Sequence, residues 1–131
     1  MGLVLKWRRR RRKFSPAEDI IARATDVILQ ERLFLNPALK CSDVAGRIGT
    51  NRTYMWEALR KRGFGFQDYL SKFRIRHFIQ NAATFAKLRS NEIAEACGFN
   101  SAKSMNKYLK IMMGLTLVDY MRRIERIPFP T

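Results

Sequence analysis

Residues 91–110, NEIAEACGFNSAKSMNKYLK, carry the clearest structural signal in this chain. The first part of this stretch has apolar residues at Ile93, Ala94 and Cys97, the spacing of one face of a helix. Gly98 follows the last of them, where a left-handed residue most readily ends a helix. A second helix is predicted from apolar residues at i, i+3, i+4 and i+7, namely Met105, Tyr108, Leu109 and Met112. The stretch therefore predicts a short helix, a tight turn and a second helix.

Polar residues mark the ends and the outer face of these two helices. Ser90 is predicted to cap the first helix, and Asn100 or Ser101 to cap the second. The outer face of the second helix carries hydrogen-bond donors, three of them cationic: Lys103, Ser104, Asn106, Lys107 and Lys110. Two short helices around a glycine turn, with donors outward on the second, are typical of a helix-turn-helix that reads DNA.

The same pattern occurs about 50 residues earlier. Nine residues match nine later ones at an offset that drifts from 49 to 51: Val44, Ala45, Ile48, Gly49, Met55, Leu59, Gly63, Asp68 and Tyr69 match Ile93, Ala94, Cys97, Gly98, Met105, Leu109, Gly114, Asp119 and Tyr120. The drift indicates one residue inserted in each of two loops of the second copy. The chain therefore holds two copies of one unit.

The first copy begins with strong local signals. Ser15-Pro16-Ala17-Glu18 is a capping box, which opens a helix that ends before Asn36-Pro37. The inward face of that helix is predicted to hold Ile20, Ala24, Val27 and Ile28. Ser42 is predicted to cap a short helix over residues 43–48, followed by a turn at Gly49, Thr50 and Asn51.

Residues 52–61 are predicted to form the first recognition helix. Met55, Ala58 and Leu59 face inward, and Thr53, Trp56, Glu57 and Arg60 face outward. A long helix over residues 66–85 then joins the copies, with an apolar stripe at Phe66, Tyr69, Leu70, Phe73 and His77. A last helix follows Gly114-Leu115-Thr116. The prediction is an all-α fold of about seven helices, in which two helix-turn-helix units are joined by a long linker helix.

The charge of the chain points to a polyanionic partner. There are 26 Lys and Arg against 11 Asp and Glu, a net charge of +15 over 131 residues. Residues 1–13 hold seven of the cations and no acid, which leaves +8 on the rest. Such a charge attracts nucleic acid first and anionic membrane second.

The sequence offers no chemistry for catalysis or metal binding. The two cysteines, Cys41 and Cys97, form no disulfide framework, and His77 is the only histidine. No Ser/His/Asp set, phosphate-binding loop or dinucleotide fingerprint occurs. We predict a non-enzyme without a cofactor.

Three interpretations of residues 1–13, MGLVLKWRRRRRK, remain open: a solvated basic tail, a phosphate-binding arm, or the stub of a membrane anchor. We assign 1–14 to a basic leader and linker, and 15–126 to a DNA-binding domain. Within that domain, the first helix-turn-helix unit spans 39–62, the linker helix 66–85, and the second helix-turn-helix unit 90–112.

The span from about Leu39 to Arg123 resembles the DNA-binding domain of the AraC/XylS family of bacterial transcription regulators. The resemblance rests on Ile93-Ala94, Gly98-Phe99, Ser101, Leu109-Lys110, Gly114, Thr116 and Tyr120, with Arg74-Ile75 and the run Asn51-Arg52-Thr53-Tyr54-Met55. Leu117 departs from it, since the family usually has proline there. The resemblance implies seven helices and activation or repression of transcription.

Matching the family's base-reading positions implies six residues that contact base edges: Thr53, Trp56, Glu57, Lys103, Ser104 and Lys107. Their chemistry suits the task, because lysine donates to guanine, glutamate accepts from cytosine N4, and tryptophan or threonine contacts a thymine methyl. Residues near helix starts and at the groove edge are assigned to phosphates: Asn51, Arg52, Arg60, Asn100, Ser101 and Lys110.

The expected partner is double-stranded DNA, bound by a monomer at an asymmetric site. RNA polymerase is a further candidate partner, and no effector is assigned. We expect a cytoplasmic location, either free or as the cytoplasmic part of a membrane-anchored regulator. The alternative is a basic helical protein that binds RNA or an anionic membrane surface, although the sequence lacks the paired aromatics and GXXG loop of common RNA modules.

Overall fold

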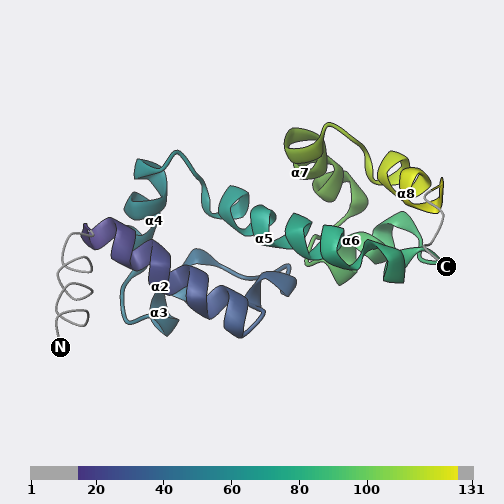
Figure 1. The fold of residues 1–131 in the computed structure, drawn as a ribbon. Helices are drawn as coiled ribbons and strands as arrows, with labels where there is room; N and C mark the ends of the chain where they lie inside the picture. Colours follow the sequence, from purple (N-terminus) through teal and green to yellow (C-terminus); the bar gives the residue numbers. More distant parts are fainter. Residues whose placement is uncertain (1–14, 127–131) are drawn as a thin grey trace, which may run out of the picture. The chain divides into compact units, whose positions relative to one another are not determined.

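The computed structural model describes residues 15–126, which hold seven α-helices, two short 3-10 segments and no strand (Figure 1). The fold is all-α, as the periodicity predicts. The described chain forms two compact units. The first holds residues up to Arg32 together with Leu39–Phe66, and the second holds Leu33–Ala38 together with the residues from Gln67 onward. The basic leader, 1–14, lies outside the described residues.

Three helices build the first unit: α2 (Pro16–Gln30), α3 (Cys41–Arg47) and α4 (Arg52–Lys61). Helix α2 begins where the capping signal predicts, because the Ser15 hydroxyl accepts the Glu18 N–H at 3.2 Å. It packs on both α3 and α4. The core of this unit consists of Ile21, Ala24, Ile28, Leu39, Val44, Ala45, Ile48, Met55, Ala58 and Leu59.

Helix α2 differs from the prediction at its end and on its buried face. It ends at Gln30, since Arg32 takes a left-handed backbone conformation with φ 54°, and the 3-10 segment η1 (Leu33–Leu35) follows. Ile21 occupies the core position that was predicted for Ile20, and Ile20 itself is only half-buried. The error is one residue of helical register, because both choices satisfy a helical spacing with Ala24.

Two of the predicted serine caps, Ser42 and Ser90, are wrong. Helix α3 begins at Cys41, one residue before Ser42, and helix α6 (Ser90–Ala96) begins at Ser90 itself. Carboxylates in the first turn do the capping instead. Asp43 accepts the N–H of Lys40 at 2.9 Å, and Glu92 accepts the N–H of Arg89 at 3.3 Å. These acids also suit the positive end of the helix dipole.

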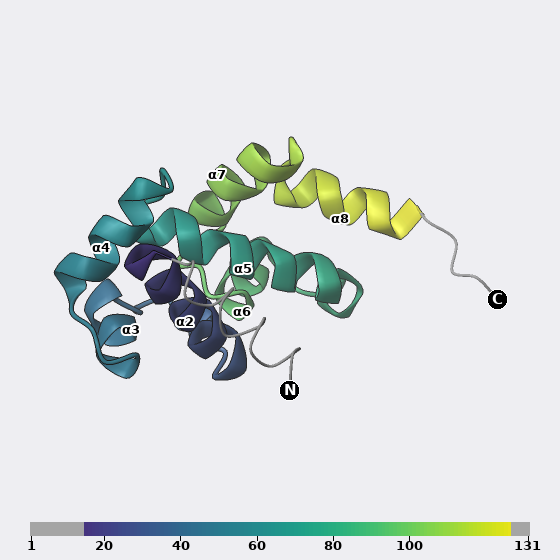
Figure 2. The same cartoon turned by 60° about the vertical axis from the view of Figure 1, so that its left-hand side comes forward.

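The second unit contains α5 (Phe66–Asn81) except for its first residue, the 3-10 segments η1 and η2 (Ala82–Phe85), α6, α7 (Ala102–Met113) and α8 (Leu117–Arg126). Helix α7 packs on α6 and leads through a short turn into α8 (Figure 2). The core of this unit consists of Ile75, Phe78, Ala82, Ile93, Ala94, Cys97, Phe99, Met105, Leu109, Leu117 and Met121.

The linker helix is shorter than predicted. The α-helix ends at Asn81, whose side-chain amide donates to the His77 carbonyl at 2.8 Å, and η2 occupies the remaining residues to Phe85. Tyr69 and Leu70 of the predicted stripe are buried, while the rings of Phe66, Phe73 and His77 are half-buried. The His77 ring lies 5.6 Å from that of Phe34, so this histidine packs among aromatic side chains.

The internal repeat is present in the structure. Helices α3 and α6 correspond at an offset of 49, the starts of α4 and α7 at 50, and the starts of α5 and α8 at 51. One expected detail is wrong. The second inserted residue lies at the end of α7, which has 12 residues against 10 in α4, and not in a loop. Met112 lies on this extension and is 43% exposed, although the stripe predicted it to be buried.

Helix α8 is fixed to α7 by a hydrogen bond that proline could not make. The Leu117 N–H donates to the Asn106 side-chain oxygen at 2.8 Å, and the Leu117 side chain is buried. Asn106 was predicted to lie on the outward face as a hydrogen-bond donor, but it is half-buried and its side-chain oxygen accepts a hydrogen bond inside the unit. Leucine in place of the family's proline therefore supplies an N–H that the structure uses.

Candidate nucleic-acid interface

The first helix-turn-helix consists of α3, a turn and α4. Gly49 ends α3 with φ +74°, and the Thr50 N–H donates to the Ala45 carbonyl at 2.9 Å. The Asn51 side-chain oxygen then accepts the Tyr54 N–H at 3.0 Å, which caps α4. The first recognition helix therefore begins at the predicted residue because turn and cap are both encoded locally.

The second helix-turn-helix, α6 and α7, repeats this geometry. Gly98 has φ +92°, and the Phe99 N–H donates to the Ala94 carbonyl at 2.9 Å. Ser101 caps α7, since its hydroxyl accepts the Ser104 N–H at 3.2 Å. Of the two predicted capping residues, Ser101 is therefore the one used.

Helix α4 presents its predicted base-reading residues to solvent. Thr53, Trp56 and Glu57 are all exposed, and Trp56 keeps 46% of its surface accessible. The Arg60 guanidinium lies 5.0 Å from the centre of the Trp56 ring, a cation–π geometry that orients both side chains. A hollow beside them is lined by Trp56, Glu57, Arg60 and Lys61. This face offers one acceptor, one aromatic surface and several cations.

Helix α7 presents a different outward face. Lys103 and Lys107 are exposed and Ser104 is half-buried. The Lys107 ammonium lies 5.3 Å from the centre of the Tyr108 ring. Helix α7 contains Lys103, Lys107 and Lys110 and no acidic residue, so every charged side chain on it is positive.

The predicted phosphate-contacting residues fall into two groups. Arg52, Arg60 and Lys110 are exposed cations on the recognition helices, and Asn100 is exposed in the second turn. Asn51 and Ser101 instead use their side-chain oxygens as helix caps. The Asn51 amide N–H groups and the Ser101 hydroxyl hydrogen keep a donor for a phosphate.

The repeat identifies a residue that sequence matching missed. At the offset of 50 that relates α4 to α7, Ser104 corresponds to Tyr54 and Trp56 corresponds to Asn106. Tyr54 is 59% exposed, whereas Asn106 is engaged with Leu117. The candidate face of α4 therefore includes Tyr54, and the offset itself was the signal that could have found it.

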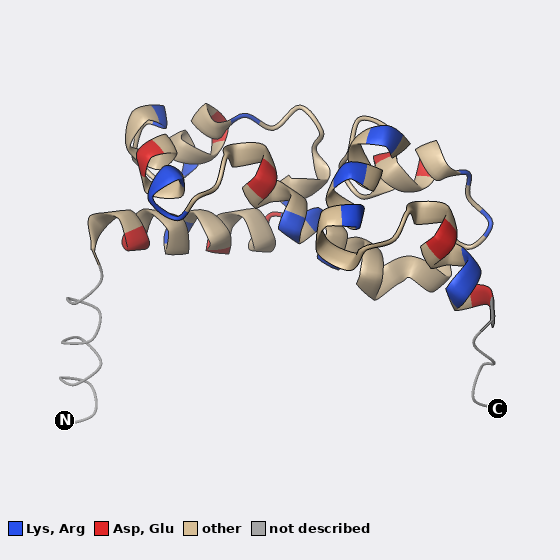
Figure 3. Ribbon diagram, turned by 90° about the horizontal axis from the view of Figure 1, so that it is seen from above, with Lys and Arg blue, Asp and Glu red and all other residues tan. Residues whose placement is uncertain are grey.

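Charged side chains lie on the helices of both units. Lys and Arg (blue in Figure 3) are spread over the helices of both units, and α2 carries Glu18, Asp19 and Asp26 together with Arg23. Burial raises the pKa of the Cys97 thiol to about 12, so this group stays neutral and unreactive at physiological pH. Among residues 15–126, no group of three His, Cys, Asp or Glu side chains is placed to hold a metal ion.

Comparison with known proteins now identifies the family. The helix-turn-helix domain family matches residues 44–123, more than half of the chain, and this match includes both recognition helices, α4 and α7. The chain belongs to the AraC-type helix-turn-helix family. Its AraC/XylS resemblance is thereby confirmed, and the chain is a DNA-binding transcription regulator domain. Helix-turn-helix regulators of this kind are typically non-enzymatic.

A solved structure agrees with this assignment. The chain is similar to the C-terminal domain of AraT, a response regulator from Geobacillus stearothermophilus, with 25% identity and a TM-score of 0.63. The similarity covers 91% of this chain and 93% of that one. The search of the curated proteins gave no match. Within the described residues, no helix has the length and apolar character needed to cross a bilayer.

Proposed function

We propose that this AraC-type chain binds double-stranded DNA sequence-specifically, with α4 and α7 in two adjacent major grooves of one site. The observation that carries the proposal is the repeated helix-turn-helix with two different outward faces. Each recognition helix is 10 or 12 residues long, about 15–18 Å, and an α-helix fits the roughly 12 Å width of the major groove. The bound domain comprises residues 15–126 and acts in the cytoplasm, where the bacterial chromosome lies.

The two faces are proposed to read different half-sites. Helix α4 reads through Thr53, Trp56 and Glu57, and the carboxylate of Glu57 suits the N4 amine of cytosine. Helix α7 reads through Lys103, Lys107 and Ser104, and lysine is a common partner of guanine O6 and N7. Because the faces differ in charge and shape, the operator is asymmetric.

Phosphate contacts are proposed to fix each helix in its groove. Arg52, Arg60 and Lys110 are exposed at positions beside the base-reading residues. Asn51, Asn100 and Ser101 lie at the starts of α4 and α7, where donors reach a backbone phosphate. These contacts position the domain and carry no sequence information.

Selection of bound sites from a random duplex pool tests this proposal. The expected result is one asymmetric site, with two half-sites whose centres lie about 10–10.5 base pairs apart. Repeating the selection with Lys103→Ala should relax preference at one or two base pairs of one half-site only, and Thr53→Ala should do so in the other half-site. A palindromic site, or no enrichment over the starting pool, would contradict the proposal.

Glu57 offers a sharper control within the same experiment. A carboxylate facing DNA repels phosphates, so Glu57→Ala should strengthen binding to unrelated duplexes while it removes the preference for one C·G pair. A merely exposed glutamate would strengthen binding to all sequences equally. The ratio of specific to non-specific affinity therefore separates a base-reading role from a solvated one.

A further inference from the structure

Arg74 is a buried cation held by backbone carbonyls. It lies on α5 and is 3% exposed. Its Nε donates to the Phe34 carbonyl at 2.7 Å, one Nη to the Asn36 carbonyl at 3.0 Å, and the other to the Gln67 side chain at 3.3 Å. No carboxylate is paired with it in the part of the chain that the structure describes. Removing a guanidinium from water is costly, and the three hydrogen bonds that offset this cost fix the side chain of Arg74 in one orientation.

The same segment is pressed against the turn of the second helix-turn-helix. A Cβ added at Gly98 would lie 2.2 Å from the Phe34 carbonyl oxygen, so only glycine allows this approach. The Phe99 ring, next in the turn, lies with its centre 5.6 Å from the Arg74 guanidinium carbon. Arg74 therefore holds residues 33–36 and the second turn together within the second unit.

Residues 33–38 come from an unexpected place in the sequence. They lie between α2 and α3, which both belong to the first unit, yet they pack in the second. The chain consequently passes between the units three times: after Arg32, after Ala38 and after Phe66. A linker helix alone would give one passage.

The second of these passages is short and stiff. Asn36 is held by Arg74, and Leu39 is already a core residue of the first unit. Only Pro37 and Ala38 lie between them. The proline ring restricts one backbone dihedral, and the Ala38 N–H donates to the Asn36 side chain at 2.9 Å. This tether leads directly into α3, which starts at Cys41.

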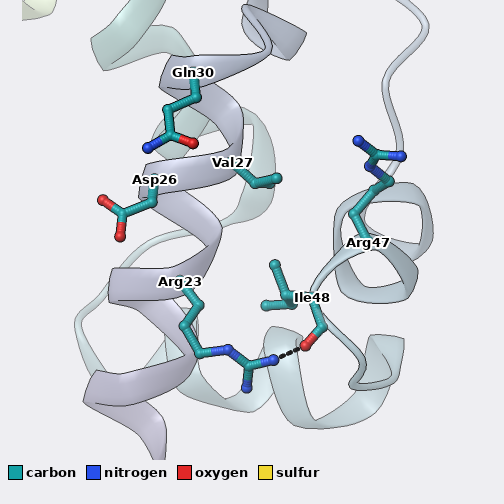
Figure 4. Close-up of a pocket in the computed structure, with 6 residues that line it drawn as sticks. All are labelled: Arg23, Asp26, Val27, Gln30, Arg47 and Ile48. Atoms are coloured by element: carbon teal, nitrogen blue, oxygen red, sulfur yellow. Dashed lines mark hydrogen bonds between the residues drawn. The ribbon is translucent and has the colours of Figure 1, made fainter.

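Arg23 in the first unit can be compared with Arg74 in the second unit. Arg23 on α2 donates to the Ile48 carbonyl, next to the turn of the first helix-turn-helix (Figure 4). Its side chain is 48% exposed and is paired with Asp19 at 3.6 Å. Arg23 therefore holds only the turn of its own unit, whereas Arg74 holds a segment that leads into the other unit.

We propose that Arg74 is a positioning residue for DNA recognition, which clamps residues 33–38 to the second helix-turn-helix and thereby fixes the half-site spacing that the chain accepts. The proposal rests on the proposed two-half-site function. Three connections join the units. Because Arg74 holds residues 33–36, only Pro37 and Ala38 remain unclamped in one of them. Releasing the clamp leaves each recognition helix folded within its own unit and lets the two units adapt to other half-site spacings.

The test measures binding of the full chain to its selected site and to versions with one or two base pairs added or removed between the half-sites. Three proteins are compared with the wild type: Arg74→Gln, the matched control Arg23→Gln, and a chain with Gly-Gly inserted between Ala38 and Leu39. Arg74→Gln should reduce the penalty for altered spacing on the order of 2- to 30-fold. The Gly-Gly insertion should do the same, and Arg23→Gln should leave the penalty unchanged.

The outcomes separate this inference from the proposed function. If Arg74 only stabilises the second unit, Arg74→Gln lowers affinity for all spacings by one factor, and the inference is overturned. If Arg74→Gln fails to fold by circular dichroism, the Gly-Gly insertion decides, because it keeps every contact of Arg74. A wild-type chain that is itself indifferent to spacing would instead overturn the proposed function.

Discussion

Raising the salt concentration should weaken duplex binding steeply, with a magnitude set by the exposed cations of the two recognition helices. Seven exposed Lys and Arg lie on α4, at its end, or on α7: Arg52, Arg60, Lys61, Arg62, Lys103, Lys107 and Lys110. None of them takes part in an ion pair within the described residues. If each comes close enough to the duplex to displace one counterion, the two recognition helices contribute a log–log slope of about −6, within a range of roughly −5 to −8.

A slope of this size corresponds to a measurable loss of duplex affinity. Between about 50 and 200 mM salt, affinity should fall on the order of 10³–10⁴-fold. Fluorescence anisotropy of a labelled duplex over this range gives the slope directly. Lys110→Gln should make the slope shallower by about 0.9, equally for specific and unrelated duplexes, because it removes one phosphate contact.

A matched control separates local contacts from total charge. Arg32 is an exposed cation outside both recognition helices, and Arg32→Gln changes the net charge of the chain by the same amount. It should leave the slope unchanged. A wild-type slope near zero, or equal effects of the Lys110 and Arg32 substitutions, would show that the cations of the recognition helices do not face DNA.

Three further predictions concern the base-reading residue Lys103, the basic leader and the buried Cys97. Lys103→Ala should lose about 1–3 kcal/mol on the specific site and relax preference at one or two base pairs, as measured by competition with single-pair variants. Deleting Arg8 to Arg12 should weaken all duplexes about equally and flatten the salt slope, and a changed sequence preference would show that this segment reads bases. If the same deletion abolished binding to anionic liposomes and spared duplex binding, the leader would be a separate membrane-binding element. The raised pKa of Cys97, about 12 in the folded chain, means that only the unfolded state loses this proton above about pH 9. The free energy of unfolding should therefore fall between about pH 9 and 12, and Cys97→Ala should remove that part of the fall in urea titrations.

Features encoded by local chemistry were predictable from the sequence. Helix α4 has the predicted bounds, because the Asn51 cap and the glycine after the helix are both short-range signals. Its inward residues Met55, Ala58 and Leu59 are buried as predicted. The repeat was readable for the same reason, since each copy carries its own turn and core.

Features that depend on distant backbone groups were not predictable. The Phe34 and Asn36 carbonyls that hold Arg74 carry no side-chain signature, so nothing in residues 33–38 indicated packing in the second unit. The wrong caps have a related cause. Serine is a common N-cap, but here acids in the first turn accept the N–H groups of Lys40 and Arg89, which shifts both helix starts.

The candidate site was predictable only in part. Family matching placed Lys103 and Lys107 on the outward face, where the structure has them. It passed over Tyr54, because the two recognition helices were matched separately and not to each other. Which outward residues contact bases stays a prediction, since exposure alone does not distinguish a base reader from a solvated side chain.

We propose that one chain reads two half-sites, one through α4 and one through α7. Inserting five base pairs between the half-sites turns them to opposite faces of the duplex, because one helical turn is about 10–10.5 base pairs. A gel shift with the native and the inserted site, together with sedimentation of the complex, tests the claim. We expect a one-chain complex on the native site and a fall toward non-specific affinity, on the order of 10³-fold or more, on the inserted site. Equal binding to both sites, or a two-chain complex on a palindrome, would contradict it.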